Sequence, residues 1–155
     1  MDKRNKRGYF GIGILNPKTE TNIGTLWRSA NILGASFIYT IGKRYKKQSS
    51  DTMKTPRHIP LYHYENFAEF YKNIPESCQL IGVEICPKSK LITDYKQHPL
   101  NAVYLLGAED NGLTPDAINK CVTVLQLPYL NNSLNVAVAG SIIMYDRLLK
   151  QETKP

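Results

Sequence analysis

Residues 103–146 read VYLLGAEDNGLTPDAINKCVTVLQLPYLNNSLNVAVAGSIIMYD, and this stretch decides the fold that the whole sequence predicts. The apolar run 103–106 is typical of a buried strand, and an acidic turn bracketed by Gly107 and Gly112 follows it. A short helix, a second strand over 122–127, a polar loop and a long closing helix come next. In a parallel sheet both strands deliver their loops to one edge, where helix amino termini leave N–H groups free for ligands. The stretch therefore predicts a ligand site at that edge.

The remainder of the chain repeats the same alternation of strands and helices. Continuous apolar runs predict further strands at 9–15, 37–41 and 80–85, with a short edge extension over 59–64. Helical spacing defines a stripe made of Ile23, Leu26, Trp27, Ala30 and Leu33, which ends at Gly34. We therefore expect an α/β fold with a mostly parallel, five- to six-stranded sheet, right-handed crossovers and helices on both faces.

The other helices are predicted from caps and aromatic spacing. Residues 65–73 are expected to turn Phe67, Phe70 and Tyr71 towards the core, while 87–100 form a polar crossover with weak helical character. Thr114 and Pro115 suit the cap and first residue of the short helix that reaches residue 121. Ser133 is the predicted cap of the closing helix.

Length and composition indicate one domain over 1–155, because 155 residues with 42% apolar side chains are enough for one core. No apolar run approaches the roughly 18 residues of a membrane span, and the start MDKRNKRGYF lacks an apolar signal segment, so we expect a cytoplasmic protein. The cysteines and histidines are scattered without metal-ligand spacing, so no metal site is expected: Cys78, Cys86, Cys121, His58, His63 and His98.

The net charge of +7 is concentrated in a tail over 1–7 and a loop over 43–57. A basic segment mixed with tyrosine and serine suits contact with RNA phosphates. The predicted phosphate-binding side chains are Lys43, Arg44, Lys46, Lys47, Lys54 and Arg57. The alternative is a solvated loop that only aids solubility.

Two common nucleotide-binding patterns are excluded. Gly8, Gly11 and Gly13 precede or lie within a strand, whereas a dinucleotide fingerprint places its glycines in the turn that opens a helix. No GxxxxGK[ST] sequence is present, which sets aside a P-loop enzyme.

Three short sequences point to one family. GAEDNGL at 107–113 and SLNVAVA at 133–139 closely resemble the second and third motifs of SpoU-type RNA ribose 2′-O-methyltransferases, the TrmH branch of the SPOUT superfamily. Asn16, followed by Asn22-Ile23-Gly24 and Arg28, resembles the first motif. Three matches in the right order are far more specific than any single glycine motif.

The resemblance implies a fold, a reaction and partners. The fold is a SPOUT domain with a deep trefoil knot near the carboxyl terminus. The reaction is methylation of an RNA ribose 2′-hydroxyl by S-adenosylmethionine, a chemistry that requires no metal. The chain is expected to form a homodimer with composite active sites. Its substrate is expected to be tRNA, in the anticodon loop, rather than ribosomal RNA, because a single domain leaves no room for a separate RNA-binding domain.

The resemblance also implies the site residues. The cofactor pocket is expected to be lined by Val83, Glu84, Leu106, Gly107, Ala108, Glu109, Gly112, Leu127, Ser133, Leu134 and Asn135. The expected catalytic set is Arg28, Asn22, Glu109, Ser133 and Asn135. Arg28 resembles a residue proposed as a base, but a guanidinium stays protonated, so we favour a positioning role. For Glu109 we favour anchoring of its loop through backbone N–H groups over contact with the active centre.

Two other functions compete with this interpretation. One is an rRNA ribose 2′-O-methyltransferase, and the other is a catalytically silent RNA-binding module of the same fold. Arg28, Glu109, Ser133 and Asn135 are all present, which favours the enzyme over the silent module.

Overall fold

The computed structural model describes residues 8–45, 59–129, 132 and 134–152. In this part of the chain a seven-stranded sheet has the spatial order β3-β2-β1-β6-β4-β7-β5, and every neighbouring pair is parallel. The strands are β1 (Tyr9–Leu15), β2 (Phe37–Ile41), β3 (Leu61–Tyr64), β4 (Gln79–Val83), β5 (Lys90–Leu91), β6 (Asn101–Gly107) and β7 (Thr123–Gln126). The helices are α1 (Glu20–Ile32), α2 (Phe67–Lys72), α3 (Pro115–Lys120) and α4 (Val136–Glu152), with a 3-10 turn η3 (Ile92–Asp94).

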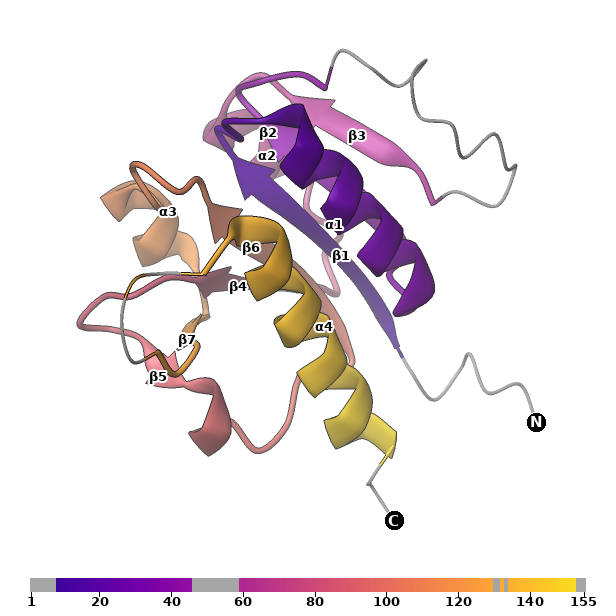
Figure 1. The fold of residues 1–155 in the computed structure, drawn as a ribbon, viewed down its shortest axis with the longest axis vertical. Helices are drawn as coiled ribbons and strands as arrows, with labels where there is room; N and C mark the ends of the chain where they lie inside the picture. The colour runs from indigo at the N-terminus through magenta and orange to yellow at the C-terminus, as the bar shows by residue number, and fades with distance from the viewer. Residues whose placement is uncertain (1–7, 46–58, 130–131, 133, 153–155) are drawn as a thin grey trace.

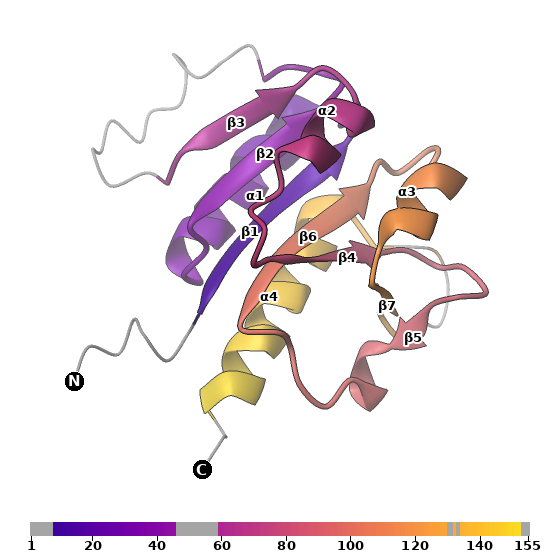
Figure 2. The same cartoon turned by 180° about the vertical axis from the view of Figure 1, so that it is seen from behind.

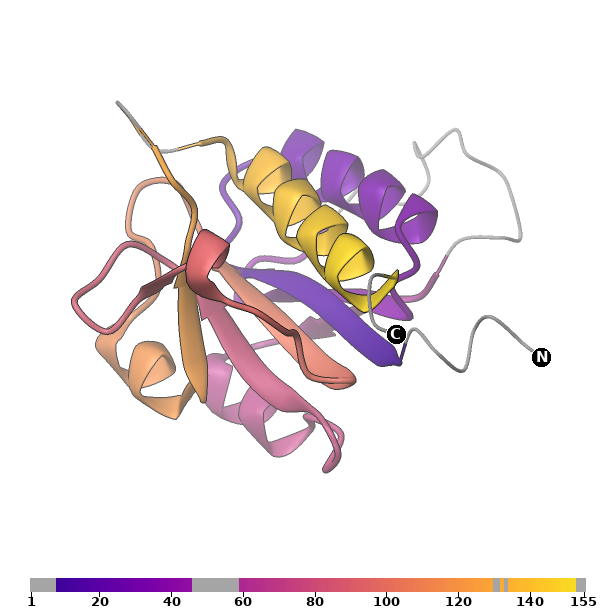
Figure 3. The same cartoon turned by 90° about the horizontal axis from the view of Figure 1, so that it is seen from below.

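Helices cover both faces of the sheet. Figure 1 and Figure 3 show α1 and α4 side by side on one face, with α2 and α3 on the other. Each face has its own apolar core, the first including Ile12 and Ile143 and the second including Phe70 and Val124. Burial of each such side chain contributes about 1.5–3 kcal/mol. The predicted α/β class, parallel sheet and two helical layers are confirmed.

Two glycines of β1 make room for aromatic rings of β2. A Cβ on Gly11 would lie 2.2 Å from the ring of Phe37, and one on Gly13 would lie 2.4 Å from the ring of Tyr39. β1 and β2 pair Gly11 with Phe37 and Gly13 with Tyr39, so each ring lies over its partner glycine. These glycines therefore serve close packing within the sheet.

The predicted number of strands is wrong, because the sheet has seven strands among the described residues. The edge extension expected over 59–64 contains β3, which pairs with β2. β5 consists of Lys90 and Leu91, two exposed residues within the expected crossover. A strand of two residues carries no periodic signal, so β5 could not be predicted from the sequence.

Helix α2 buries only one of the three aromatic residues predicted to face the core. Phe70 is 2% exposed and Phe67 is partly buried, but Tyr71 is 43% exposed and lies beneath the ammonium of Lys120. The prediction for Tyr71 is wrong because α2 has six residues, and a helix this short presents little more than one residue to the core.

The carboxyl half of α4 is fixed by four polar side chains, here called the α4 lock: His98, Tyr104 and Arg147, which are buried, and Asp146, which is partly exposed. The ring of His98 is hydrogen bonded to the Tyr104 hydroxyl and the Asp146 carboxylate, each at 2.7 Å. Arg147 donates to the carbonyls of Pro99 at 2.7 Å and Leu100 at 2.8 Å. Burial lowers the pKa of His98 and raises that of Tyr104. The lock therefore holds His98 neutral while it ties α4 to β6.

The trefoil knot depends on how the chain passes from β7 to α4. Residues 130, 131 and 133 of that connection lie outside the described residues, so the knot stays a prediction. No helix in the described ranges is long and apolar enough to cross a membrane.

Candidate active site

A cavity of about 440 Å³ opens beside the carboxyl ends of β4, β6 and β7. This volume lies within the roughly 300–1,000 Å³ of small-molecule pockets. The lining includes most of the residues predicted for the cofactor: Val83, Glu84, Leu106, Gly107, Ala108, Glu109, Gly112, Leu127 and Leu134. Asn135 is absent from the lining, and Ser133 lies outside the described residues.

The sequence did not identify the rest of the lining. These residues are Ile85, Asp110, Asn111, Leu113, Ile118, Leu125, Gln126, Tyr129, Val136 and Ala139. Most of them flank a predicted residue in the sequence, so the cavity lining extends beyond the motifs themselves. Ile118 comes from α3, and only the packing of α3 against the strands brings it to the cavity.

The turn between β6 and α3 is held by Glu84, which follows β4. One carboxylate oxygen of Glu84 accepts from the N–H of Leu113 at 2.7 Å, and the other accepts from the N–H of Ile85 at 2.9 Å. Gly112 has φ +61°, and a Cβ there would lie 2.1 Å from the Glu84 carboxylate. Gly112 is therefore required both by its backbone conformation and by the close approach of Glu84.

The backbone anchor that we predicted for Glu109 is thus made by Glu84. Within the described residues Glu109 accepts no backbone N–H, and its carboxylate instead meets two side-chain amides. The sequence could not make this distinction, because Glu84 is remote from the turn along the chain and close to it only through the pairing of β4 with β6.

Three side chains meet at the mouth of the cavity, and we call them the amide–carboxylate cluster: Asn22, Glu109 and Asn135. Asn135 Nδ2 donates to Asn22 Oδ1 at 2.9 Å and to Glu109 Oε1 at 3.3 Å. Asn22 Nδ2 donates to the same Glu109 oxygen at 3.5 Å. The cluster joins α1, the turn after β6 and the start of α4, which the sequence separates by up to 113 residues.

Asn135 also caps α4, in place of Ser133. Its Oδ1 accepts from the N–H groups of Ala137 at 2.9 Å and Val138 at 3.2 Å, the N-cap arrangement. The helix begins at Val136, so a cap at Ser133 is wrong. One asparagine therefore orients the cluster with its amide nitrogen and starts α4 with its amide oxygen.

Arg28 is not part of the cluster. It lies exposed on α1, does not line the cavity, and forms no hydrogen bond or ion pair with the described residues. Thr25, one turn earlier on α1, lines a groove against α4 together with Val138 and Ile142. Arg28 is therefore presented outwards beside that groove, as its predicted position away from the buried stripe requires.

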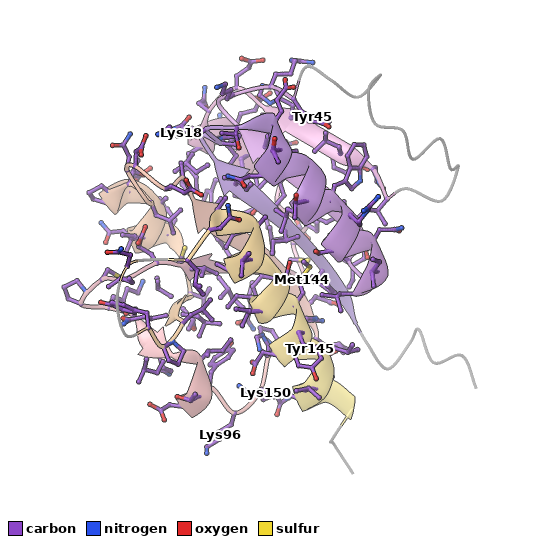
Figure 4. The ribbon with its side chains drawn as sticks, in the orientation of Figure 1. Lys18, Tyr45, Lys96, Met144, Tyr145 and Lys150 are labelled. Carbon is purple, nitrogen blue, oxygen red and sulfur yellow. The ribbon has the colours of Figure 1, made fainter. Side chains whose placement is uncertain are left out.

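An ion pair joins two segments at the edge of the cavity. Lys18 Nζ lies 2.8 Å from Asp110 Oδ2, and this contact raises the pKa of Lys18 above its ordinary value. Lys18 lies just before α1 in Figure 4. Both side chains are well exposed, so the pair adds little to stability.

Of the predicted phosphate-binding residues, the structure describes Lys43 and Arg44. Lys43 donates to the carbonyl of Lys18 at 3.1 Å, and Arg44 lies 3.7 Å from Glu65. Lys46, Lys47, Lys54 and Arg57 lie outside the described residues. In the described ranges no group of three or more His, Cys, Asp or Glu side chains could hold a metal ion.

Comparison with known proteins places the chain in a family. The model of the SpoU rRNA Methylase family matches residues 10–145. A relative in Archaeoglobus fulgidus, named "Uncharacterized tRNA/rRNA methyltransferase", is 27% identical over 150 residues, which cover 89% of this chain and 63% of the relative. The chain thus spans a little over 60% of the length of the curated relatives it matches.

Two solved structures share the fold. The AdoMet-bound rRNA methyltransferase from Sinorhizobium meliloti superposes with a TM-score of 0.80 at 22% identity, over 91% of this chain and 56% of that one. A structure described by the words "2-OH methylation of C/U34 on tRNA" has a TM-score of 0.81 at 19% identity, over 96% of this chain and 99% of that one.

Proposed function

The chain belongs to the SpoU methylase family, and from this premise we propose that it transfers a methyl group from S-adenosylmethionine to a ribose 2′-hydroxyl of RNA. One observation carries the proposal. Asn22, Glu109 and Asn135 come from three distant motifs and meet in hydrogen bonds at the mouth of the cavity. The family prediction is confirmed, and the reaction is our proposal.

The cavity suits S-adenosylmethionine in size and lining. Apolar side chains such as Leu106, Leu125 and Leu127 offer walls for the adenine ring, while the turn 107–112 offers backbone groups. Glu109 and Asp110 place negative charge beside a cofactor that carries a sulfonium and an ammonium group. When bound, the cofactor supplies an activated methyl group, and the protein supplies position and a dry environment.

The amide–carboxylate cluster orients the attacking hydroxyl. The two asparagine amides hold one oxygen of Glu109, and within the described residues the other oxygen, Oε2, has no hydrogen-bond partner. That oxygen accepts the hydrogen bond of the ribose 2′-hydroxyl and steers it towards the methyl group. Arg28 holds the neighbouring phosphate or ribose and stabilises the developing alkoxide, whose proton passes to Oε2 of Glu109 as the new bond to the methyl carbon forms. Ser133, part of the third motif, assists in holding the substrate.

We propose a homodimer with composite active sites. Helix α4 exposes an apolar stripe made of Val138 at 45%, Ile142 at 38%, Tyr145 at 54% and Leu149 at 45%. Tyr145 is labelled on this helix in Figure 4. An apolar stripe this long suits an interface between copies. Thr25, one turn before Arg28 on α1, lines the groove that this stripe borders, so pairing two copies along the stripe would bring Arg28 towards the partner's cavity.

Mixing two inactive variants tests the composite site. Arg28→Ala and Asn135→Ala remove residues that different subunits contribute to a shared site. After subunit exchange half of the dimers contain one copy of each variant, and each such dimer has one intact site out of two. The mixture should therefore recover about one quarter of wild-type activity. Variants that recover nothing after verified exchange would rule out shared sites. Sedimentation of the wild-type protein as a monomer would contradict the homodimer itself.

We further propose a tRNA substrate, methylated in the anticodon loop, and a single cytoplasmic domain over 1–155. The basic tail and loop supply positive charge for recognition, which suits a compact stem-loop with a splayed target nucleotide. Mapping alkali-resistant ribose methylations in total RNA from wild-type and deletion cells tests the substrate. Loss from ribosomal RNA alone would contradict the tRNA assignment.

Calorimetric titration with S-adenosylmethionine and S-adenosylhomocysteine tests the enzyme itself. Binding of both ligands is expected, with heat that disappears when the turn is filled by Gly107→Val, since a Cβ at Gly107 would lie 2.4 Å from the Gly112 backbone. A folded wild-type protein that binds neither ligand would instead be the silent RNA-binding module.

A further inference from the structure

A second, smaller hollow lies on the opposite face of the sheet from α1 and α4. It has a volume of about 210 Å³, and its lining includes the aromatic residues Tyr9, Phe37, Tyr62, Tyr64 and Phe70 together with Asn73. Figure 2 shows α2 near the carboxyl ends of β1, β2 and β3, and among the described residues no helix covers the amino-terminal halves of these strands on this face of the sheet. The volume is below the roughly 300 Å³ at which pockets for drug-sized molecules begin, so it suits a single planar ring system.

An aromatic row forms the floor of this hollow. The ring of Phe37 lies 5.8 Å from that of Tyr9 on one side and 5.8 Å from that of Tyr62 on the other, measured between centroids. Phe37 is buried over Gly11, whereas Tyr9 is 43% exposed and Tyr62 is 48% exposed. Three neighbouring strands therefore offer two accessible aromatic rings around a fixed third one, an arrangement that can stack a flat ligand.

The rim of the hollow adds a hydrogen-bonding group. Asn73 ends α2, and its Nδ2 donates to the carbonyl of Glu69 at 2.8 Å. In the described part of the chain the Oδ1 of Asn73 accepts no hydrogen bond, so it remains able to accept one from the edge of a ligand. The hollow thus combines ring stacking with polar contact at one edge.

Charge along the sequence selects the class of ligand. Residues 1–7, which lead into β1, contain four basic residues and one acidic residue, and residues 54–58, which lead towards β3, contain Lys54, Arg57 and His58. In the sequence these two basic segments directly precede the strands that carry Tyr9 and Tyr62. Flat rings on strands that follow basic segments match a polyanion with unpaired bases, which is single-stranded RNA.

We propose that this aromatic hollow binds one unpaired nucleobase of the RNA substrate. The hollow is separate from the methyl-transfer cavity, since no residue lines both. The hollow lies mainly over β1, β2 and β3, whereas the methyl-transfer cavity lies at the carboxyl ends of β4, β6 and β7. Tyr9 of the hollow pairs with Asn101, which lies six residues and roughly 20 Å along β6 from Gly107 of the cavity. The base held here is therefore not the nucleotide that is methylated. The proposal rests on the proposed function for the identity of the RNA.

The test uses the full chain and an RNA hexanucleotide carrying one 2-aminopurine, whose fluorescence falls when it stacks on an aromatic ring. Wild-type protein should quench the probe, and Tyr62→Ala should weaken binding about tenfold, the usual loss of one stacking ring. Tyr62→Phe keeps the ring and should bind as wild type does. Tyr9→Leu keeps apolar volume without a ring and should weaken binding as Tyr62→Ala does.

Tyr71→Ala is the matched control, because Tyr71 is as exposed as Tyr9 but lies outside the hollow. It should leave probe affinity unchanged. In methylation assays Tyr62→Ala should raise KM for RNA while kcat and S-adenosylmethionine affinity stay at wild-type values.

Three results would overturn the proposal. The first is equal probe affinity of wild type, Tyr62→Ala and Tyr9→Leu. The second is an equal loss in Tyr71→Ala. The third is a change in sedimentation of Tyr62→Ala with probe affinity intact, which would make the hollow a protein contact. Failure of the proposed function looks different, because wild-type protein would then bind no S-adenosylmethionine, whatever the probe reports.

Discussion

The two ends of α4 are both held by polar side chains, yet the two groups differ in exposure and in unused bonding capacity. The α4 lock near the carboxyl end is buried, with His98 and Arg147 each 1% exposed and directed at partners within the protein. The amide–carboxylate cluster near the amino end lies at a cavity, and one oxygen of Glu109 is unused among the described residues. Polar groups sealed from water stabilise the fold, whereas those left partly open at a cavity are available to a ligand.

Arg147→Ala should have the largest effect of any substitution that tests this difference. It removes a fully buried guanidinium together with its hydrogen bonds to the carbonyls of Pro99 and Leu100, so the free energy of unfolding should fall by about 3 kcal/mol. Urea unfolding measures the loss. Lys96→Ala, an exposed neighbour labelled in Figure 4, serves as control and should change stability by less than about 0.5 kcal/mol. Equal stability of the two variants would show that the lock does not hold α4.

Glu109→Gln should give the opposite profile. It removes the carboxylate at the cavity, so methyl transfer should fall about 100-fold, while the free energy of unfolding changes by less than about 1 kcal/mol. Single-turnover assays with RNA measure the first quantity and urea unfolding the second. Glu76→Gln, an exposed substitution after α2, is the charge-matched control. A large loss of stability in Glu109→Gln would mean that the amide–carboxylate cluster, like the α4 lock, stabilises the fold.

Asn135 allows its two roles to be separated. Asn135→Ala removes the cap of α4 and the donor to Glu109, so it should cost about 1 kcal/mol of stability and most of the activity. Asn135→Asp keeps an oxygen for the cap but replaces the donor by a second carboxylate. We expect near wild-type stability and the low activity of Asn135→Ala. Activity that returns in Asn135→Asp would mean that only the cap matters.

The smallest effect concerns pH and the α4 lock. Burial lowers the pKa of His98 below its ordinary value of 6.5, although Asp146 opposes this shift while Arg147 and Lys150 reinforce it. Below pH 6.5 the unfolded chain therefore binds a proton before the folded chain does, and stability falls as pH falls towards the lower folded value. Urea unfolding at pH 7.5 and 5.5 should show a steeper loss for wild type than for His98→Gln. An equal change in the free energy of unfolding between the two pH values in wild type and His98→Gln would contradict a neutral buried His98.

The sequence predicted those parts of the fold that depend on local pattern. β1 and β2 match the predicted boundaries because each is a continuous apolar run bounded by glycine or by asparagine and proline. Thr114 caps α3 as predicted, accepting from the N–H of Ala117. The cavity also lies at the predicted edge of the sheet, because parallel strands bring the loops that follow them to one edge.

The errors concern side chains whose roles depend on tertiary contacts. Ser133 and Asn135 are equally good cap residues, and the choice depends on where packing allows α4 to begin. Glu84 and Glu109 are both acidic residues after strands, but only the pairing of β4 with β6 brings Glu84 to the turn. Helical spacing predicted that Tyr71 faces the core, but α2 is short and Tyr71 is exposed to solvent.

The position of β6 has a consequence for how the chain folds. β6 lies between β1 and β4 in the middle of the sheet, and its first residue, Asn101, pairs with Tyr9 across 92 intervening positions. A ribosome that has released only β1 to β4 has therefore released strands whose central partner is still missing. Long-range parallel pairing of this kind is slow, and open strand edges aggregate while they wait. Translation speed around residues 100–110, and the chaperones that cover the edges of β1 and β4 until then, should therefore govern the yield of folded protein.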